Sequence, residues 1–218
     1  MAIWAGTTIA TSRAAGAPAR VPTGLPRSRI TMSASPAPLI LLTGERGIGK
    51  STVCSTLRDF VARRSVRCGG FLTRRELDDA GATCGLSLEE AATGTCHRLA
   101  ATREELDGPR IGPFSMDAAV LALGVRLARS AFDANLDLVF LDEIGPLELA
   151  QGLGFAPAIP LAAAHPRTAI ILTLRPTLVA AATSRLAPRV ARVEIVTQET
   201  RDVLPRRLGE EILAALLR

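Results

Sequence analysis

The stretch Gly44–Thr52, with the sequence GERGIGKST, constrains the fold of this chain more than any other feature. Its first eight residues fit the pattern G-x-x-x-x-G-K-[ST]. A short apolar run, Leu39–Leu42, precedes the stretch, and apolar residues at helical spacing follow it. This order predicts a buried strand, a glycine loop that binds phosphate, and an amphipathic helix.

Lys50 within this loop is the only lysine among the 26 basic side chains of the chain. Glycines let several backbone N–H groups converge on a phosphate, and a helix N-terminus adds about half a positive charge. The compact ammonium of lysine reaches between the β- and γ-phosphates of a nucleotide, where the planar guanidinium of arginine is bulkier. A single lysine at this position therefore favours a polyphosphate site over an accidental glycine-rich turn.

The whole loop is expected to hold the nucleotide. Lys50 should counter the charge of the β- and γ-phosphates, and so act in catalysis as well as in binding. The Ser51 hydroxyl is the expected Mg²⁺ ligand, and Thr52 is a second candidate, for the α-phosphate. The predicted binding residues are Gly44, Glu45, Arg46, Gly47, Ile48, Gly49, Lys50, Ser51 and Thr52.

A second apolar run, Leu138–Leu141, ends in the paired acids Asp142 and Glu143 and looks like a Walker B element. Asp142 is expected to hold Mg²⁺ through water, because this ion keeps much of its hydration shell. Glu143 is expected to orient and polarise the attacking water. This second acid favours hydrolysis over a kinase reaction. The alternative interpretation is a pair of acids that cap a turn.

Beyond the loop, apolar runs of strand length alternate with amphipathic segments, which is typical of an α/β fold with a mainly parallel sheet flanked by helices. Short alternating stretches over residues 74–101 predict a small antiparallel hairpin insertion. We expect one P-loop domain at residues 38–218. Strands are expected at residues 39–42, 66–73, 138–141, 168–174 and 190–196, and helices after the loop, at 117–132, from Pro176 and from Pro205.

Residues 1–37 are rich in Ala, Arg, Ser, Thr, Gly and Pro and show no sustained period, which predicts a disordered N-terminal extension. Its acid-free composition is loosely like that of a transit peptide. We interpret it as the product of an upstream start codon, with Met32 as the true start. Four arginines in this extension account for most of the net charge of +5, so the rest of the chain is nearly neutral.

A nearly neutral body gives no indication of a nucleic-acid partner. The apolar runs are far shorter than the roughly 20 residues that cross a bilayer, so no membrane association is expected. The four cysteines lack metal-ligand spacing, and we interpret them as reduced thiols of a cytoplasmic protein. With no Tyr and six Phe, little aromatic surface can stack on a base, which predicts loose base selectivity.

Several motifs follow one another along residues 38–205 in a recognisable order. After the phosphate loop come Gly70–Thr73 (GFLT), Ile111–Phe114 (IGPF) with Asp117, Asp142–Leu149 (DEIGPLEL) and Val196–Asp202 (VTQETRD). Together they resemble the small P-loop nucleoside-triphosphatases first described from thermophiles, a family that includes the cancer-related nucleoside-triphosphatase. The resemblance implies a RecA-like P-loop sheet that slowly hydrolyses ATP, GTP and other nucleoside triphosphates with Mg²⁺.

The chain departs from that family after GFLT, where Arg74 and Arg75 stand in place of frequent acids. Candidates for a transition-state cation are Arg175, just past a strand end, and Arg110. Glu148 is either a second acid near the site or a charge at a helix start. Two other functions stay open: a small-molecule or nucleotide kinase, and a nucleotide-dependent regulatory switch. The sequence does not indicate a protein partner.

Overall fold

The computed structural model describes residues 36–217. Residues 1–35 of the predicted N-terminal extension lie outside the described residues. Its last two residues lead directly into the first strand, and the backbone N–H of Ala37 donates a hydrogen bond to the carbonyl oxygen of Pro166 at 2.8 Å.

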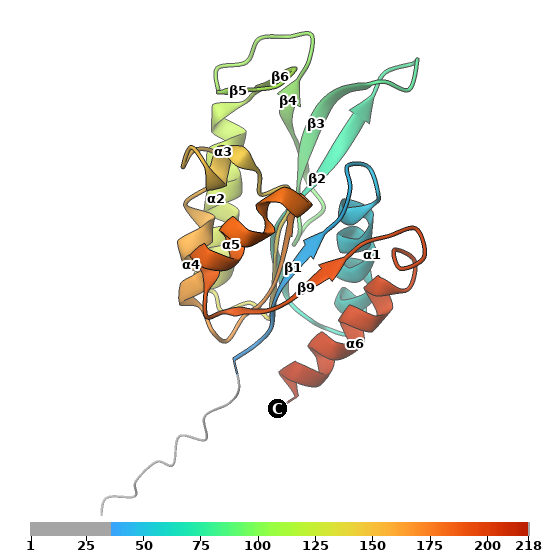
Figure 1. Cartoon of the computed structure of the whole chain (residues 1–218), viewed down its shortest axis with the longest axis vertical. Helices are drawn as coiled ribbons and strands as arrows, with labels where there is room; N and C mark the ends of the chain where they lie inside the picture. The colour runs from blue at the N-terminus through green and yellow to red at the C-terminus, as the bar shows by residue number, and fades with distance from the viewer. Residues whose placement is uncertain (1–35, 218) are drawn as a thin grey trace, which may run out of the picture. The chain divides into compact units, whose positions relative to one another are not determined.

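The strands of the described residues join in one nine-stranded sheet, in the order β5-β6-β4-β3-β2-β7-β8-β1-β9 (Figure 1). The order differs from the sequence order because crossover helices connect the parallel strands. The strands are β1 (Leu39–Thr43), β2 (Cys68–Leu77), β3 (Thr83–Glu90), β4 (Cys96–Ala101), β5 (Arg110–Ile111), β6 (Phe114–Met116), β7 (Leu138–Leu141), β8 (Ala169–Leu174) and β9 (Val190–Ile195).

The parallel half of the sheet contains β2, β7, β8, β1 and β9. Strand β8 lies between β1, which leads into the glycine loop, and β7, which ends before the paired acids. All five strands lie close to the predicted positions. Because parallel strands end at the same edge of a sheet, the loop and the acids meet there although they are about a hundred residues apart in sequence.

Residues 74–101 are antiparallel, as expected, but they do not form a separate layer. Strand β2 pairs with β7 as far as Phe71 and Leu141, then continues past the end of β7 and pairs with β3. Strands β4, β6 and β5 extend the same antiparallel sheet. The fold is therefore α/β with a mixed sheet, in which one strand belongs to both halves.

Helices cover both faces of the sheet, with α1 and α6 on one face and α2, α4 and α5 on the other (Figure 1). The helices are α1 (Lys50–Ala62), α2 (Ala118–Asp133), α3 (Pro146–Leu149), α4 (Ala158–Ala164), α5 (Val179–Leu186) and α6 (Leu204–Leu216), with the 3₁₀ helix η1 (Pro176–Leu178) before α5. In the described part of the chain, every helix is too short or too polar to cross a membrane.

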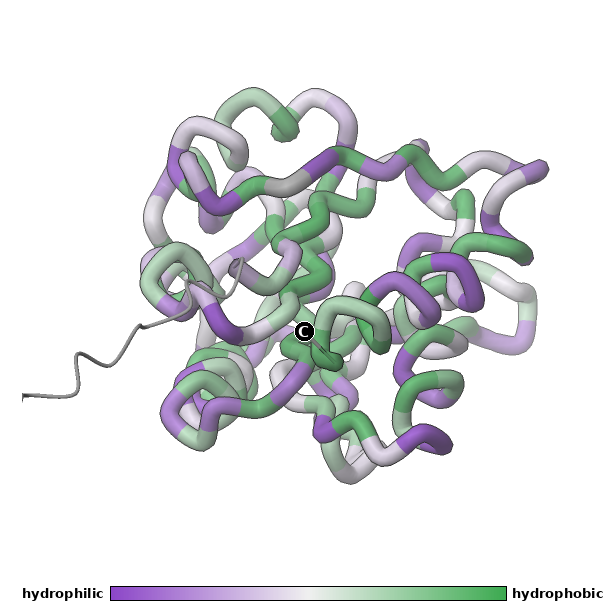
Figure 2. Tube along the Cα trace, turned by 90° about the horizontal axis from the view of Figure 1, so that it is seen from below, coloured by the Kyte–Doolittle hydropathy of each residue, from purple (hydrophilic) through white to green (hydrophobic). Residues whose placement is uncertain are grey.

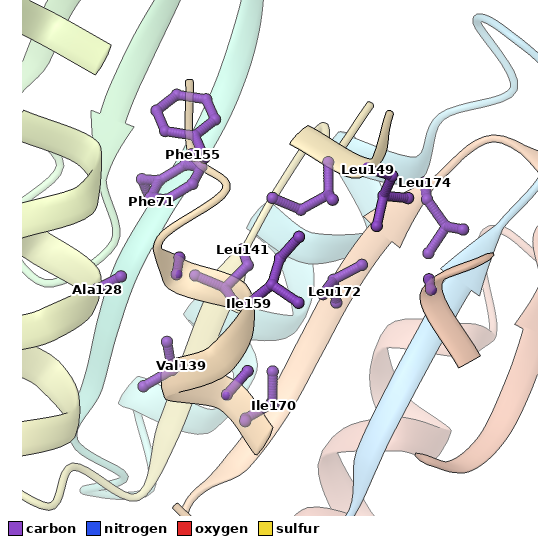
Figure 3. Packing of buried hydrophobic residues seen from close by; sticks show 14 of the residues in the cluster. Phe71, Ala128, Val139, Leu141, Leu149, Phe155, Ile159, Ile170, Leu172 and Leu174 are labelled. Carbon is purple, nitrogen blue, oxygen red and sulfur yellow. The ribbon is translucent and has the colours of Figure 1, made fainter. Parts of the chain in front are cut away.

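The sheet is buried on both faces, so its strands are apolar throughout. Along β1, Leu39 and Leu41 face the cluster under α2 and α4, and Ile40 and Leu42 face the cluster under α1 and α6. Figure 3 shows part of the first cluster, and Figure 2 shows hydrophobic segments running through the middle of the fold. Burying each such side chain stabilises the fold by about 1.5–3 kcal/mol.

Candidate active site

The glycine loop joins β1 to α1 in a backbone shape that only glycine accommodates well. Gly44 has φ 149°, and a β-carbon there would lie 2.7 Å from the carbonyl oxygen of Val196. Gly49 has φ 110° and is the N-cap of α1, where its carbonyl accepts the backbone N–H of Val53 at 2.9 Å. The amides of residues 50–52 come before this first helical bond and have no partner within the helix. They form the anion-binding end of α1.

Lys50 begins α1 and is only 8% exposed. Its Nζ donates hydrogen bonds to the loop carbonyls of Gly44 at 2.8 Å and Glu45 at 3.0 Å. Burial lowers the pKa of Lys50, while the negative charges of Glu143 and Asp142 oppose this shift. The ammonium thus lies over the loop, between the phosphate-binding amides and the paired acids.

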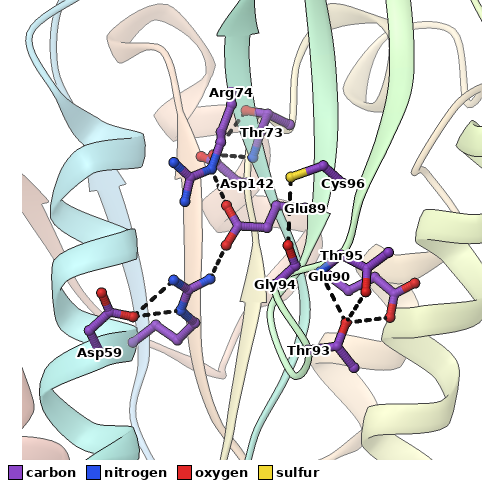
Figure 4. Close-up of polar contacts among 11 residues, drawn as sticks. Asp59, Thr73, Arg74, Glu89, Glu90, Thr93, Gly94, Thr95, Cys96 and Asp142 are labelled. Carbon is purple, nitrogen blue, oxygen red and sulfur yellow. Dashed lines mark hydrogen bonds and ion pairs between the residues drawn. The ribbon is translucent and has the colours of Figure 1, made fainter.

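Asp142 is fully buried, and its carboxylate accepts four hydrogen bonds. Figure 4 shows the two that come from Thr73. One oxygen accepts from both the amide and the hydroxyl of Thr73, each at 2.9 Å. The other accepts from the Thr173 hydroxyl and, at 3.1 Å, from the amide of Glu143. Four donors match the four lone-pair positions of a carboxylate. Asp142 can therefore bind a metal-bound water only if a threonine hydroxyl turns away.

The sequence analysis did not identify Thr73 and Thr173 as partners of Asp142. Leu141, the residue before Asp142, pairs with Phe71 of β2 on one side and with Leu172 of β8 on the other. Thr73 lies two residues after Phe71, and Thr173 lies one residue after Leu172. They flank Asp142 because β2 and β8 are the two neighbours of β7. The strand order that brings them together is a property of the folded sheet.

Glu143 has φ 58°, a left-handed conformation that is uncommon for a residue with a side chain. Its amide donates to the Thr173 hydroxyl at 2.8 Å, which fixes this conformation. Strain of this kind costs about 1–3 kcal/mol and is concentrated at functional sites. The Glu143 side chain is exposed in the pocket, but many protein atoms surround its carboxyl group. This crowding and the charge of Asp142 raise the pKa of Glu143, while Lys50 and Arg175 oppose the shift.

The loop, Lys50 and Glu143 open onto a pocket of about 430 Å³. Ser51 and Thr52 line it, together with side chains of β2 and α1. An adjoining cavity of about 120 Å³ shares Lys50 and Glu143 with it. Arg46 lines this second cavity together with several apolar side chains, among them Leu99, Phe114 and Phe155. Glu45 is exposed and Ile48 packs against the core cluster of α1.

The two arginines expected as transition-state cations lie in different places. Arg175 follows β8, is exposed, and lines the smaller cavity near Glu143. Arg110 lies on β5, far along the antiparallel extension, where its guanidinium pairs with Glu105 at 3.5 Å. The structure therefore brings Arg175 to the candidate site and leaves Arg110 outside both cavities.

Glu148 lies in the first turn of α3 and also lines the smaller cavity, so the structure agrees with both interpretations that the sequence left open. It is buried, and its carboxylate accepts the amides of Gly145 at 2.8 Å and Phe155 at 3.2 Å. Burial raises the pKa of Glu148, and these two amides oppose the shift. Its hydrogen bonds cap α3 and tie the following loop to it, which keeps the segment after Glu143 in place.

Arg75 is a further site residue that the sequence analysis did not identify. It lines both cavities, and its Nη1 would lie 3.5 Å from a β-carbon placed on Gly47 of the loop. The sequence did not predict that Arg75 lies beside the phosphate loop, because residues 74–101 have the pattern of an inserted hairpin.

Comparison with known proteins agrees with this geometry. A sequence model of a family described as NTPase matches residues 39–209, which is most of the chain. The chain belongs to this NTPase family. The predicted family, the RecA-like P-loop fold and the enzyme class, nucleoside-triphosphatase, are thereby confirmed.

Among relatives of this NTPase, the nucleoside-triphosphatase THEP1 of Thermofilum pendens is 32% identical over 184 residues, which cover 82% of this chain and 97% of that protein. The protein of the same name from Methanothermobacter thermautotrophicus is 37% identical over 111 residues, which cover 50% of this chain and 62% of that protein. The solution structure of a human cancer-related nucleoside triphosphatase superposes with a TM-score of 0.62 at 21% identity, covering 82% of this chain and 98% of that chain.

Proposed function

We propose that this NTPase hydrolyses nucleoside 5′-triphosphates to the diphosphate and phosphate in a Mg²⁺-dependent reaction. One observation carries the proposal: the amide-rich loop, Lys50 and Glu143 face the same 430 Å³ pocket. A triphosphate in the loop places its anionic end between the ammonium that neutralises it and the carboxylate that positions water.

The residues of the site suit Mg²⁺. This ion takes a few hard oxygen ligands from a protein and keeps waters and substrate phosphates as the rest. The Ser51 hydroxyl can supply such an oxygen, and the Asp142 carboxylate can supply one through water once a threonine hydroxyl turns away from it. Within residues 36–217, no cluster of three His, Cys, Asp or Glu side chains could form an all-protein cage. When bound, Mg²⁺ would neutralise charge on the β- and γ-phosphates.

In the proposed reaction, the water oxygen forms a bond to the γ-phosphorus, and the bond from this phosphorus to the β–γ bridging oxygen breaks. Glu143 accepts a proton of the water, while Lys50 and the loop amides stabilise the charge on the departing diphosphate. Arg175, which lines the adjoining cavity, is one candidate cation for the γ-phosphoryl oxygens. The proton on Glu143 is then released to solvent together with phosphate.

We also propose loose base selectivity and action in the cytosol without nucleic acid. The described residues that line the main pocket include no aromatic side chain that would stack a base. Phosphate release from ATP, GTP, CTP, UTP and their deoxy forms, with and without Mg²⁺, tests the function on the full chain. The proposal fails if none is hydrolysed above background. A rate that rises strongly with single-stranded DNA or RNA would contradict the absence of a nucleic-acid partner.

The smaller cavity favours a second candidate, transfer of the γ-phosphoryl group to a hydroxyl of a small molecule. A water nucleophile needs no apolar cavity, yet Leu99, Phe114 and Phe155 line about 120 Å³ next to Glu143. Phosphorus NMR of ATP turnover with benzyl alcohol and glycerol distinguishes the two candidates. ADP with inorganic phosphate as the only other phosphorus product supports hydrolysis, and ADP with a phosphate ester supports transfer.

A further inference from the structure

Arg74 and Arg75 are neighbours on β2, beyond the point where β7 ends; both line the main pocket, but their guanidinium groups have different partners. Successive side chains of a strand face opposite sides of the sheet. Arg74 faces α1, where its guanidinium and that of Arg58 both hydrogen-bond to the buried carboxylate of Glu89 (Figure 4). Arg75 lies opposite Leu86 of β3 and lines both cavities of the site.

The guanidinium of Arg75 is close to the phosphate loop, and no side chain within the described part of the chain engages it. Its Nη1 is 3.5 Å from the position of a β-carbon on Gly47. Among residues 36–217, no carboxylate forms an ion pair with Arg75, whereas Arg74 next to it is held by Glu89. Arg75 is thus a cation that is free to contact a ligand in the loop.

The antiparallel extension is fixed against α1, which sets the distance between Arg75 and the loop. Glu89 is 3% exposed, and it joins Arg58 of α1 to Arg74 of β2. Since α1 begins at the last residues of the phosphate loop, this network fixes β2 relative to the same helix that binds the phosphates. A long side chain on β2 can then meet the end of a bound triphosphate.

We propose that the Arg75 guanidinium binds the γ-phosphoryl oxygens during hydrolysis and acts as an arginine supplied by the chain itself to stabilise the transition state. Negative charge spreads over these oxygens as the phosphoryl group is transferred, and the fork of N–H donors on a guanidinium matches them. This proposal rests on the proposed function.

The test compares Arg75→Ala and Arg75→Lys with the unaltered full chain in ATP hydrolysis. We expect kcat to fall about 10²–10³-fold in Arg75→Ala, while KM and the affinity for ADP change by less than about threefold. The lysine variant should recover little, because an ammonium lacks the fork. Binding of ADP with aluminium fluoride, which imitates the transferring phosphoryl group, should weaken in proportion to kcat.

Two further measurements separate catalysis from folding. Arg103→Ala removes an exposed arginine of the same extension, one that pairs with Asp78 outside both cavities, and should keep the unaltered kcat. Added guanidinium ion at millimolar concentration should restore part of the rate of Arg75→Ala and should not stimulate Arg103→Ala. An Arg75→Ala protein with unchanged kcat, or one that loses ADP affinity and kcat equally, overturns the inference.

The two proposals fail in different ways. If the unaltered chain releases no phosphate from any triphosphate, the proposed function is wrong and the role of Arg75 is wrong with it. If the unaltered chain hydrolyses a triphosphate and Arg75→Ala does so at the same rate, only the role of Arg75 is wrong.

Discussion

The Thr173 hydroxyl accepts the backbone amide of Glu143 at 2.8 Å and so fixes the left-handed conformation of that residue. The same hydroxyl donates to the buried carboxylate of Asp142. One side chain of β8 therefore orients both acids at the end of β7. This arrangement makes Thr173 a residue whose loss should affect stability and turnover together.

Thr173→Val keeps the shape of the side chain but removes both hydrogen bonds. We expect the free energy of unfolding to fall by about 1–3 kcal/mol, because the Asp142 carboxylate and the Glu143 amide lose a buried partner. The rate of ATP hydrolysis should fall as well, since Glu143 is no longer fixed. Urea denaturation and phosphate release measure the two effects. Thr173→Ser keeps the hydroxyl, so its free energy of unfolding and its rate of ATP hydrolysis should stay close to those of the unaltered protein. Losses in Thr173→Ser as large as those in Thr173→Val would contradict this explanation.

Lys50→Arg tests whether the single lysine is required by the shape of the site. Because Lys50 is buried over the loop, a guanidinium should clash with the space that the β- and γ-phosphates need. We expect nucleotide binding to weaken and hydrolysis to fall by at least about 10²-fold. Lys50→Ala should lose both binding and turnover. Titration calorimetry with ATP provides the check, and wild-type affinity in the arginine variant would show that the ammonium is replaceable.

Glu143 should impose a pH limit on hydrolysis. The group must be ionised to accept a proton, and protein crowding and the charge of Asp142 raise its pKa above the usual glutamate value. Activity is therefore expected to be lost as the pH falls through this raised pKa, at a higher pH than an ordinary carboxyl would give. Rates measured from pH 4 to 8 test this.

Glu143→Gln is the matched variant for that pH profile. The variant should bind nucleotide, and its kcat should fall by about 10²-fold or more. Its remaining activity should not show the loss at low pH that we attribute to Glu143. An unchanged rate in this variant would remove Glu143 from the reaction. A variant that is slower but still loses activity over the same low-pH range would show that another group causes the pH limit.

Glu89→Gln should destabilise the fold in a pH-dependent way. Burial alone would raise the pKa of Glu89, but hydrogen bonds from Arg74 and Arg58 outweigh burial and lower it. Because the pKa of Glu89 is lower in the folded state, its ionised carboxylate stabilises the fold at pH values above the pKa of an unfolded glutamate, which is about 4.3. This contribution is lost as the pH falls through the folded-state pKa. We expect a loss of about 1–3 kcal/mol at pH 7 that shrinks below about pH 4.

Urea denaturation at pH 7, 5 and 3.5 measures this difference. Glu210→Gln removes an acid from the exposed pair with Arg206 on α6 and should cause no measurable change at any of these pH values. A Glu89→Gln protein as stable as the unaltered chain at pH 7 would show that the buried network is replaceable.

The sequence predicted the elements that have strong local patterns. The glycine loop between β1 and α1, the acids after β7 and the start of α2 at Asp117 each follow from apolar runs and from caps that act over a few residues. The loop residues and Glu143 line one pocket because parallel strands end at one edge of the sheet.

What the sequence did not show depends on strand order and register. Thr73 and Thr173 reach Asp142 because their strands flank β7, and Arg75 reaches the loop because β2 continues beyond its parallel partner. Residues 74–101 have the alternation of an independent hairpin, and that pattern gives no sign that they wall the pocket. Arg110 and Arg175 look alike as candidates in sequence, and only the fold separates them.

Strand β2 passes without a break from the parallel half of the sheet into the antiparallel extension, so the residue that pairs with the end of β7 and the arginine beside the glycine loop belong to one strand. Loss of the pairing between β2 and β3 would therefore displace Arg75 from the loop even if the parallel half of the sheet stayed intact.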